Sequence, residues 1–222
     1  MARNTMRTNL PQIESYMQRC MRDSAHDTEH VYRVLNYALD IAKHEGGADF
    51  ELLTTACLLH DISRTEQFAD PTIDHAIHGS LKAHGWLVEN GYSAEFADAV
   101  RGCIETHRFR SDNPPRNLEA KILFDADKLD VCGAVGIART LLYKSHVIEP
   151  LYSFTAQGEI SDGTEDTGKS FMQEYKFKLE GIYDKFYTQR GFALAAKRKS
   201  AAQNFYDSLL SEVRECYSEA TL

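Results

Sequence analysis

Apolar residues recur every three to four positions along most of the chain, a spacing that places them on one face of a helix. Between residues 9 and 21, for example, Leu10, Ile13 and Met17 follow this spacing. The sequence contains no alternation of apolar and polar residues long enough for a strand, and no internal repeat. The pattern therefore predicts an all-α fold, with residues 1–222 as a single domain. Helices are expected over about residues 9–21, 27–43, 50–61, 72–89, 93–108, 117–130, 134–146, 170–188 and 192–217.

Residues that start and stop helices support these boundaries. Asn9, Asp49 and Ser93 each precede an apolar period and are good N-cap residues. The two prolines in residues 113–115 cannot continue a helix, so this segment is expected to be a loop. Residues 153–169 are polar, acidic and contain glycine, which predicts an exposed loop.

The composition changes this picture only by excluding classes of protein. A formal net charge of −8 argues against an extended basic surface for duplex nucleic acid. The five cysteines form no CxxC motif, and their apolar neighbours suit buried thiols in a reducing compartment. Residues 1–25 lack the apolar core of a signal peptide, and no apolar run approaches the roughly 20 residues that span a membrane. We therefore expect a cytoplasmic protein without a membrane partner.

The dipeptide His60–Asp61 ends the most apolar of the expected helices, in the run ELLTTACLLHDISR. An imidazole nitrogen and a carboxylate oxygen are both good ligands for a divalent metal. Upstream, HDTEHVYRV contains His26 and His30, which would share a face if both were helical. Because Asp27 is expected to cap this helix, His26 lies outside it and His30 is the better ligand candidate. Downstream, Asp127 in FDADKLD lies among buried-type positions, where a carboxylate needs a cation or strong donors.

These residues reproduce the order H…HD…D, and at this point the sequence resembles the HD-domain superfamily of metal-dependent phosphohydrolases. The resemblance is carried by HVYRV around His30, LLHDISR around His60–Asp61, and DADKLDVCGAVGIART around Asp127. The later segments TQRGFALAAKR and FYDSLLSEV resemble the corresponding sequences of the small stand-alone bacterial members of the YpgQ and YedJ type. The resemblance implies an HD-domain helical bundle, whose metal-site core spans about residues 26–146. The C-terminal helices, at about residues 170–217, would pack on this core.

The resemblance also implies that His30, His60, Asp61 and Asp127 bind one divalent ion. Two imidazoles and two carboxylates offset the charge of the ion and leave positions open for water and substrate. An ion held in this way lowers the pKa of a bound water and polarises a phosphoryl oxygen. Mixed nitrogen and oxygen ligands favour Mn²⁺, with Mg²⁺, Fe²⁺, Zn²⁺, Co²⁺ or Ni²⁺ as alternatives.

Phosphoryl transfer needs positive side chains near the phosphate as well. Arg64 lies one helical turn beyond Asp61 and is the first candidate for binding the substrate and stabilising its charge. Lys128, beside Asp127, is the second candidate for the same two roles. Glu66, just after Arg64, is a candidate base or water-orienting residue.

Two further histidines, His78 and His107, occupy places where some superfamily members hold a second metal. They are candidates for binding the substrate phosphate, for protonating the leaving oxygen, or for ligating a second ion. No acidic ligand obviously joins them in the sequence. We expect His26 to lie at the surface and His75 to be exposed or structural.

The leading hypothesis is a metal-dependent phosphohydrolase whose substrate is a small phosphate compound, namely a nucleotide. Similarity to the small bacterial members favours nucleoside triphosphate pyrophosphohydrolysis, which gives a monophosphate and pyrophosphate. A 5′-deoxynucleotidase and a cyclic nucleotide phosphodiesterase are the alternatives among enzymes. A nucleotide-binding signalling module without turnover is the alternative from another class, and a two-iron oxygenase would need more ligands than can be assigned. A homodimer through the C-terminal helices is a further hypothesis.

Overall fold

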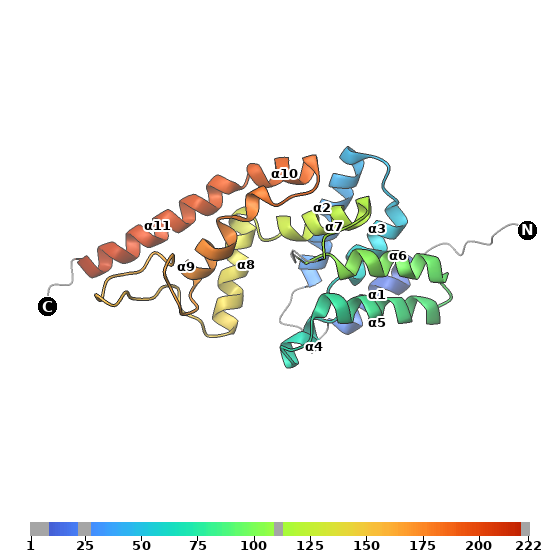
Figure 1. The fold of residues 1–222 in the computed structure, drawn as a ribbon, viewed down its shortest axis with the longest axis horizontal. Helices are drawn as coiled ribbons and strands as arrows, with labels where there is room; N and C mark the ends of the chain where they lie inside the picture. Colours follow the sequence, from blue (N-terminus) through green and yellow to red (C-terminus); the bar gives the residue numbers. More distant parts are fainter. Residues whose placement is uncertain (1–8, 22–27, 109–112, 219–222) are drawn as a thin grey trace, which may run out of the picture. The chain divides into compact units, whose positions relative to one another are not determined.

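The computed structural model describes residues 9–21, 28–108 and 113–218, and these residues form helices joined by loops (Figure 1). No strand occurs in these three ranges, where the one isolated β-bridge joins Phe154 to Ile160. The all-α prediction is therefore confirmed. The chain forms two compact units, residues 1–127 and residues 128–222. The α-helices are α1 (Leu10–Cys20), α2 (Thr28–Glu45), α3 (Phe50–Leu59), α4 (Arg64–Ala69), α5 (His75–Glu89), α6 (Ala94–Glu105), α7 (Leu118–Leu129), α8 (Gly133–His146), α9 (Phe171–Glu174), α10 (Gln189–Ala196) and α11 (Lys199–Ser218).

Side-chain caps fix where several helices of the first unit begin. Asn9, Asp49 and Ser93 accept hydrogen bonds from the first backbone amides of α1, α3 and α6, as the sequence predicted. Asp74 caps α5 in the same way, so this helix begins at His75 rather than at Thr72. The expected cap at residue 27 lies outside the described residues.

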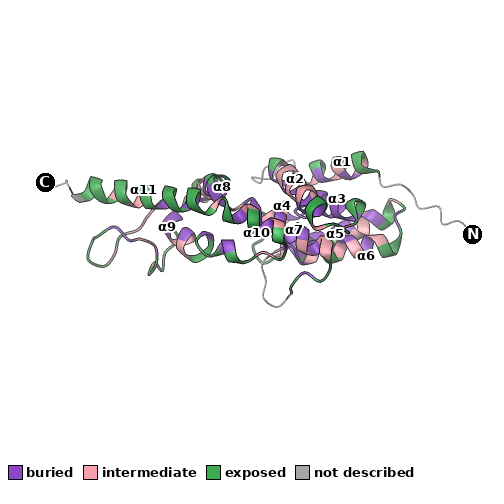
Figure 2. Ribbon diagram, turned by 90° about the horizontal axis from the view of Figure 1, so that it is seen from above, coloured by how far each residue is buried: buried purple, intermediate pink, exposed green. Residues whose placement is uncertain are grey.

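The core of the first unit is built around α3. Leu52, Leu53, Cys57 and Leu59 are all buried, and the helix packs on α1, α2 and α6. Figure 2 shows α3 mainly in the colour of buried residues. Burying each leucine side chain contributes about 1.5–3 kcal/mol relative to leaving it exposed. This apolar packing against α1, α2 and α6 therefore fixes the position of the carboxyl end of α3.

The residues that follow α3 form a tight turn instead of continuing the helix. The expected helix over residues 50–61 ends at Leu59, and turns follow through Ser63 before α4 begins. The amide of Arg64 donates to the carbonyl of Asp61 across this turn, at 3.0 Å. Both His60 and Asp61 are buried in this turn.

The prediction of two long, continuous helices at the C-terminus was wrong, because both are divided in the second unit. The helix expected over residues 170–188 consists of α9, a π-helical stretch at Tyr175–Leu179 and a 3₁₀ turn at Ile182–Asp184. Gly181 interrupts it, because glycine disfavours continued helix. The helix expected over residues 192–217 begins earlier, where Thr188 caps α10, and is divided into α10 and α11.

The polar segment 153–169 is a loop, as predicted, but side-chain contacts hold it in place. The carboxylate of Asp166 accepts hydrogen bonds from Ser153 at 2.5 Å and from Ser161 at 2.6 Å. The hydroxyl of Tyr206 donates to the carbonyl of Asp162. The loop thus packs on α11 within the second unit. Across the described ranges, no helix has the length and apolar character needed to cross a membrane.

Candidate metal centre

Six side chains with metal-ligating atoms converge in the first unit. His30 comes from α2, His60 and Asp61 from the turn after α3, and Asp127 from α7. His75 begins α5, and His107 follows α6. All are buried except Asp127, whose side chain is 29% exposed. Their ligand atoms form two clusters, each within 4.8 Å: His30, His60 and Asp127 in one, and Asp61, His75 and His107 in the other.

Three of the four ligands that the sequence predicted form the first cluster, and the fourth, Asp61, lies beside it. His30 Nε2 lies 3.2 Å from Asp127 Oδ1, 3.5 Å from Asp61 Oδ2 and 3.4 Å from His60 Nε2. His60 Nε2 lies 3.6 Å from Asp61 Oδ2. Ligand bonds of roughly 2.1 Å around one ion place neighbouring ligand atoms about 3.0–3.5 Å apart. The spacing of these four side chains therefore fits a single divalent ion.

The second cluster uses the other oxygen of the same aspartate. Asp61 Oδ1 lies 3.3 Å from His75 Nε2 and 3.6 Å from His107 Nε2. The carboxylate of Asp61 consequently faces two imidazoles on each side. This arrangement supplies the acidic ligand that the sequence did not reveal for a second ion.

Hydrogen bonds fix the orientation of three of the imidazoles. His60 Nδ1 lies 2.7 Å from the carbonyl of Cys57, and His107 Nδ1 lies 2.6 Å from the carbonyl of Ile104. His75 Nδ1 lies 2.5 Å from the Gln67 side-chain oxygen. Because each of these oxygens accepts, each Nδ1 is the protonated nitrogen, and each Nε2 presents a lone pair to the cluster.

Burial keeps two of the imidazoles, those of His60 and His75, neutral. It lowers the pKa of His60 to about 4, against the opposing effect of the Asp61 charge. Burial likewise lowers the pKa of His75 to about 4, again against Asp61. At neutral pH both rings are therefore uncharged, which is the form that binds a metal.

The carboxylates remain charged despite their surroundings. Burial alone would raise the pKa of Asp61, but the Arg64 guanidinium and His60 hold it well below its usual range. Burial would also raise the pKa of Asp127, and the hydrogen bond from His30 lowers it below its usual range. Both groups therefore supply negative charge for a cation.

Two atoms at the centre of this arrangement have no hydrogen-bond partner. Among the described residues, Asp61 Oδ1 and His75 Nε2 are buried and make no hydrogen bond, although they face each other. A carboxylate oxygen and an imidazole lone pair repel at this distance, and leaving them unsatisfied costs about 1–3 kcal/mol each. A divalent cation satisfies both. The donor set and these two atoms together fit a metal centre.

Arg64 lies at the edge of the centre. Its Nε donates to Asp61 Oδ2 at 3.2 Å, and its side chain is 28% exposed. Glu66, the candidate base, is paired instead with the ammonium group of Lys82, which also donates to the carbonyl of Ile62 at 3.1 Å. Arg64 thus remains beside the ligands, as its position in the sequence predicted.

The structure places the remaining candidates as follows. His78 is exposed, and its Nδ1 lies 2.9 Å from the Ser63 hydroxyl, so it is absent from both clusters. Lys128 belongs to the second unit, where its ammonium group donates to the carbonyl of Lys185 at 3.0 Å. His26 lies outside the described residues.

His75 is the member of the centre that sequence reasoning missed. It was expected to be exposed or structural, but it is buried and faces Asp61. His75 and His78 are three residues apart, and the spacing alone does not tell which one points inward. The usable signal was Asp74, because a capping aspartate makes His75 the first residue of the helix.

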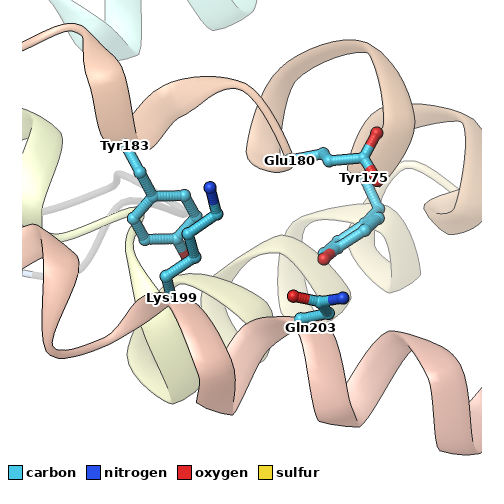
Figure 3. A pocket seen from close by; sticks show the side chains of 5 residues that line it. All are labelled: Tyr175, Glu180, Tyr183, Lys199 and Gln203. Carbon is cyan, nitrogen blue, oxygen red and sulfur yellow. The ribbon is translucent and has the colours of Figure 1, made fainter.

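The second unit has a small hollow of about 230 Å³, which does not share this chemistry (Figure 3). Tyr183 and Lys199 lie on one side of it in this view, and Tyr175, Glu180 and Gln203 on the other. One carboxylate and one amide oxygen are a poor donor set for a transition metal. The metal chemistry is therefore assigned to the first unit.

Comparison with known proteins agrees with this assignment. Residues 28–132 match the family model of the HD domain. The Bacillus subtilis protein YpgQ is 34% identical over 139 residues, which are 60% of this chain and 64% of YpgQ. The alignment thus spans less than two thirds of that relative.

Solved structures resemble a larger part of the chain. The crystal structure of YpgQ is 27% identical, covers 92% of this chain and 95% of its own, and superposes with a TM-score of 0.70. A crystal structure of YpgQ in complex with ADP is 26% identical, with coverages of 91% and 94% and a TM-score of 0.68. A predicted HD superfamily hydrolase from an uncultured Thermotogales bacterium is 29% identical, with coverages of 91% and 92% and a TM-score of 0.62. All six of the side chains in the two clusters fall within residues 28–132, the segment that matches the HD domain.

Proposed function

We propose that this protein is a metal-dependent phosphohydrolase that acts on a nucleotide. The observation that carries the proposal is the Asp61 carboxylate, whose two oxygens face two separate pairs of imidazoles. Such a donor set serves to hold divalent cations, and the similarity to HD superfamily hydrolases supports a hydrolytic role.

We infer that His30, His60, Asp61 and Asp127 hold one ion, and that Asp61, His75 and His107 hold a second. A bound divalent ion supplies a Lewis acid for a phosphoryl oxygen and lowers the pKa of a water molecule. Mixed imidazole and carboxylate ligands favour Mn²⁺ over Mg²⁺, which prefers oxygen ligands and retains its waters.

Arg64 is proposed to bind the phosphate of the substrate. Its guanidinium offsets the charge of Asp61, and its partly exposed position lets it face a phosphoryl group at the edge of the centre. A planar guanidinium can form two parallel hydrogen bonds to a phosphate. His78 and Lys128 remain predicted substrate contacts, and His107 is now assigned to the second ion.

The proposed substrate class is the nucleotides, and within it the nucleoside triphosphates. The related protein YpgQ has been crystallised with ADP, which supports a nucleotide ligand for this chain. We infer pyrophosphohydrolysis, in which water attacks the α-phosphorus and pyrophosphate leaves with the bridging oxygen. A 5′-deoxynucleotidase would release orthophosphate instead, and a cyclic nucleotide phosphodiesterase would release a linear monophosphate.

The test is a hydrolysis assay over nucleoside triphosphates, deoxynucleoside monophosphates and cyclic nucleotides. The protein is first treated with a chelator and then reloaded with Mn²⁺, Mg²⁺, Co²⁺, Ni²⁺, Fe²⁺ or Zn²⁺. We expect Mn²⁺-dependent release of pyrophosphate from a triphosphate. We expect Asp61→Ala to lose at least about 10³-fold in rate, which is of the order that removing metal catalysis costs.

Asp98→Ala is the matched control, because Asp98 is a largely exposed carboxylate that pairs with His84 on α5. It should hydrolyse the substrate at the wild-type rate. Metal binding without hydrolysis of any phosphate compound would reject the enzyme and favour the binding module. Metal-dependent turnover that survives Asp61→Ala would reject the proposed centre.

A further inference from the structure

The side chain of Gln67, on α4, contacts the ring nitrogen of His75 that points away from Asp61. Its oxygen lies 2.5 Å from His75 Nδ1 and 3.3 Å from Arg64 Nη1. Its amide nitrogen donates to the backbone carbonyl of Ile73 at 3.0 Å. One amide therefore connects the backbone before α5 with two side chains of the metal centre.

The neighbours of Gln67 leave its amide only one orientation. The carbonyl of Ile73 can only accept a hydrogen bond, so it must face the amide nitrogen. The guanidinium of Arg64 can only donate, so it must face the oxygen. His75 Nδ1 lies 2.5 Å from this acceptor oxygen and 3.3 Å from the donor Arg64 Nη1. Because the contact with the oxygen is much the shorter, Nδ1 carries the proton, and His75 Nε2 keeps its lone pair toward Asp61.

Without the contact from Gln67, a proton on His75 Nε2 would compete with the metal for this nitrogen. His75 Nε2 and Asp61 Oδ1 are 3.3 Å apart, so a proton on Nε2 would form a hydrogen bond to the carboxylate. A hydrogen bond to a charged group contributes about 1.5–3 kcal/mol. It would occupy both ligand atoms at once and close the second ion site.

We propose that Gln67 is a positioning residue that holds His75 in the Nδ1-protonated tautomer and thereby keeps Nε2 available as a ligand of the second ion. This inference rests on the proposed metal centre. Gln67 does not contact the metal or the substrate; it acts through His75. The effect is specific to the second ion, because the first cluster uses His30 and His60, whose Nε2 atoms Gln67 does not contact.

The test begins with metal-free protein, in which the tautomers of the histidines are read from their ¹⁵N chemical shifts. His75→Ala identifies the signal of His75. Gln67→Met preserves the length of the side chain but removes both hydrogen-bonding groups. We expect wild-type His75 to be protonated at Nδ1, and His75 of Gln67→Met to be protonated at Nε2.

The same proteins are then titrated with Mn²⁺ alone, and the bound ions are counted. Wild type should bind two ions, and Gln67→Met should keep the affinity of the first ion while that of the second falls about 10–100-fold. Gln12→Met is the matched control, since the Gln12 amide donates to Asn90 at 2.7 Å, between α1 and the end of α5. It should bind both ions like wild type.

The proposal is overturned if His75 keeps the proton on Nδ1 in Gln67→Met, if that variant binds both ions with wild-type affinity, or if wild type binds one ion only. Failure of the proposed function would look different. In that case the tautomer and the second ion would respond as expected, but no nucleotide would be hydrolysed.

Discussion

A buried carboxylate costs free energy unless cations or donors compensate it, and Asp61 depends on several of them. Its side chain is about 1% exposed. It contacts Arg64 and is surrounded by four imidazoles. These imidazoles compensate the charge poorly, because three of them present lone pairs to the centre. Arg64 therefore carries most of the compensation until a cation binds.

Replacing Arg64 should slow the reaction, in addition to removing this compensation from Asp61. Arg64→Ala is expected to lower kcat/KM about 10²-fold, the usual cost of removing one preorganised donor to a transition-state oxygen. Arg64→Lys should recover only part of this loss, because an ammonium group cannot form the same two-pronged contact. The measurement is kcat and KM at saturating Mn²⁺.

The control for this substitution is Arg101→Ala, since Arg101 pairs with Glu105 along α6, at 3.8 Å. It should retain wild-type kinetics. If Arg64→Ala hydrolysed its substrate within twofold of the wild-type rate, the phosphate-binding role of Arg64 would be wrong.

For single residues, the sequence predicted the candidate ligands that lie in recognisable sequence motifs. It did not predict residues whose role depends on the direction in which the side chain points. His30, His60, Asp61 and Asp127 were predicted from their order and surroundings, and the structure brings their ligand atoms together. His75 was missed because its burial depends on where α5 begins. The role of Gln67 depends on its contacts with Arg64 in the same helix, with the backbone of Ile73 and with His75 at the start of α5, and no local pattern encodes them.

Among the elements, α8 ends in an unusual way. The amide of Glu149 donates to the carbonyl of Lys144, and the amide of Ile148 to that of Ser145, which is the Schellman pattern. That pattern requires a left-handed residue, and Ile148 takes it with φ of 56°. Isoleucine is poorly suited to this conformation, and its side chain is 92% exposed.

Ile148→Gly should therefore stabilise the second unit. Relieving the left-handed conformation is worth about 1 kcal/mol, and little packing is lost because the side chain is exposed. The free energy of unfolding from denaturant titration checks this expectation. A variant less stable than wild type would show that Ile148 is stabilised by contacts that outweigh the strain.

The loop 153–169 offers a paired test of how its backbone is held. Gly158 and Gly163 both have positive φ, 80° and 90°. An added Cβ at Gly163 would lie closer than 3.0 Å to the backbone of Met172, whereas at Gly158 it would meet nothing within 4 Å. Gly158→Ala should cost about 1 kcal/mol of stability from backbone strain alone.

Gly163→Ala should cost at least about 2 kcal/mol, because a clash adds to the same strain. It should also make the loop more susceptible to limited proteolysis. Equal effects of the two substitutions on stability and cleavage would mean that the contact with Met172 is not what anchors the loop.

The elements themselves were largely predictable, and their interruptions were not. Caps such as Asn9, Asp49 and Ser93 marked starts that the structure reproduces. The irregular stretch after α9 escaped prediction because the apolar spacing of residues 170–188 fits one continuous helix. The break at Gly181 is a local preference that periodicity does not report.

For the whole molecule, the proposed ligands and the single tryptophan lie in the same unit. Trp86 stacks on Tyr16 with ring centres 4.4 Å apart, and both belong to residues 1–127. Fluorescence of Trp86 therefore reports the unfolding of the unit that would bind the metal.

Adding a divalent ion should raise the unfolding temperature that Trp86 reports. Free ion at 100 times its dissociation constant stabilises the folded state by about 2.7 kcal/mol. For a chain of this size that is roughly 5–10 °C. The measurement is thermal unfolding with Mn²⁺ and with chelator.

His60→Ala, which removes a ligand of the first cluster, should lose most of this shift. Asp98→Ala should keep it. An equal shift in the His60 variant would place the ion elsewhere.

The single carboxylate shared by both clusters has a consequence for how the centre fills. Asp61 has one negative charge, so an ion held through Oδ2 would weaken the attraction of Oδ1 for a second ion. Two cations bound to opposite oxygens of one carboxylate would also repel each other. Binding at the two proposed sites would thus be linked by an unfavourable coupling free energy, which is the same whichever ion arrives first. Occupancy would rise in two separate steps with metal concentration, so the protein would pass through a half-loaded form with a different charge at its centre.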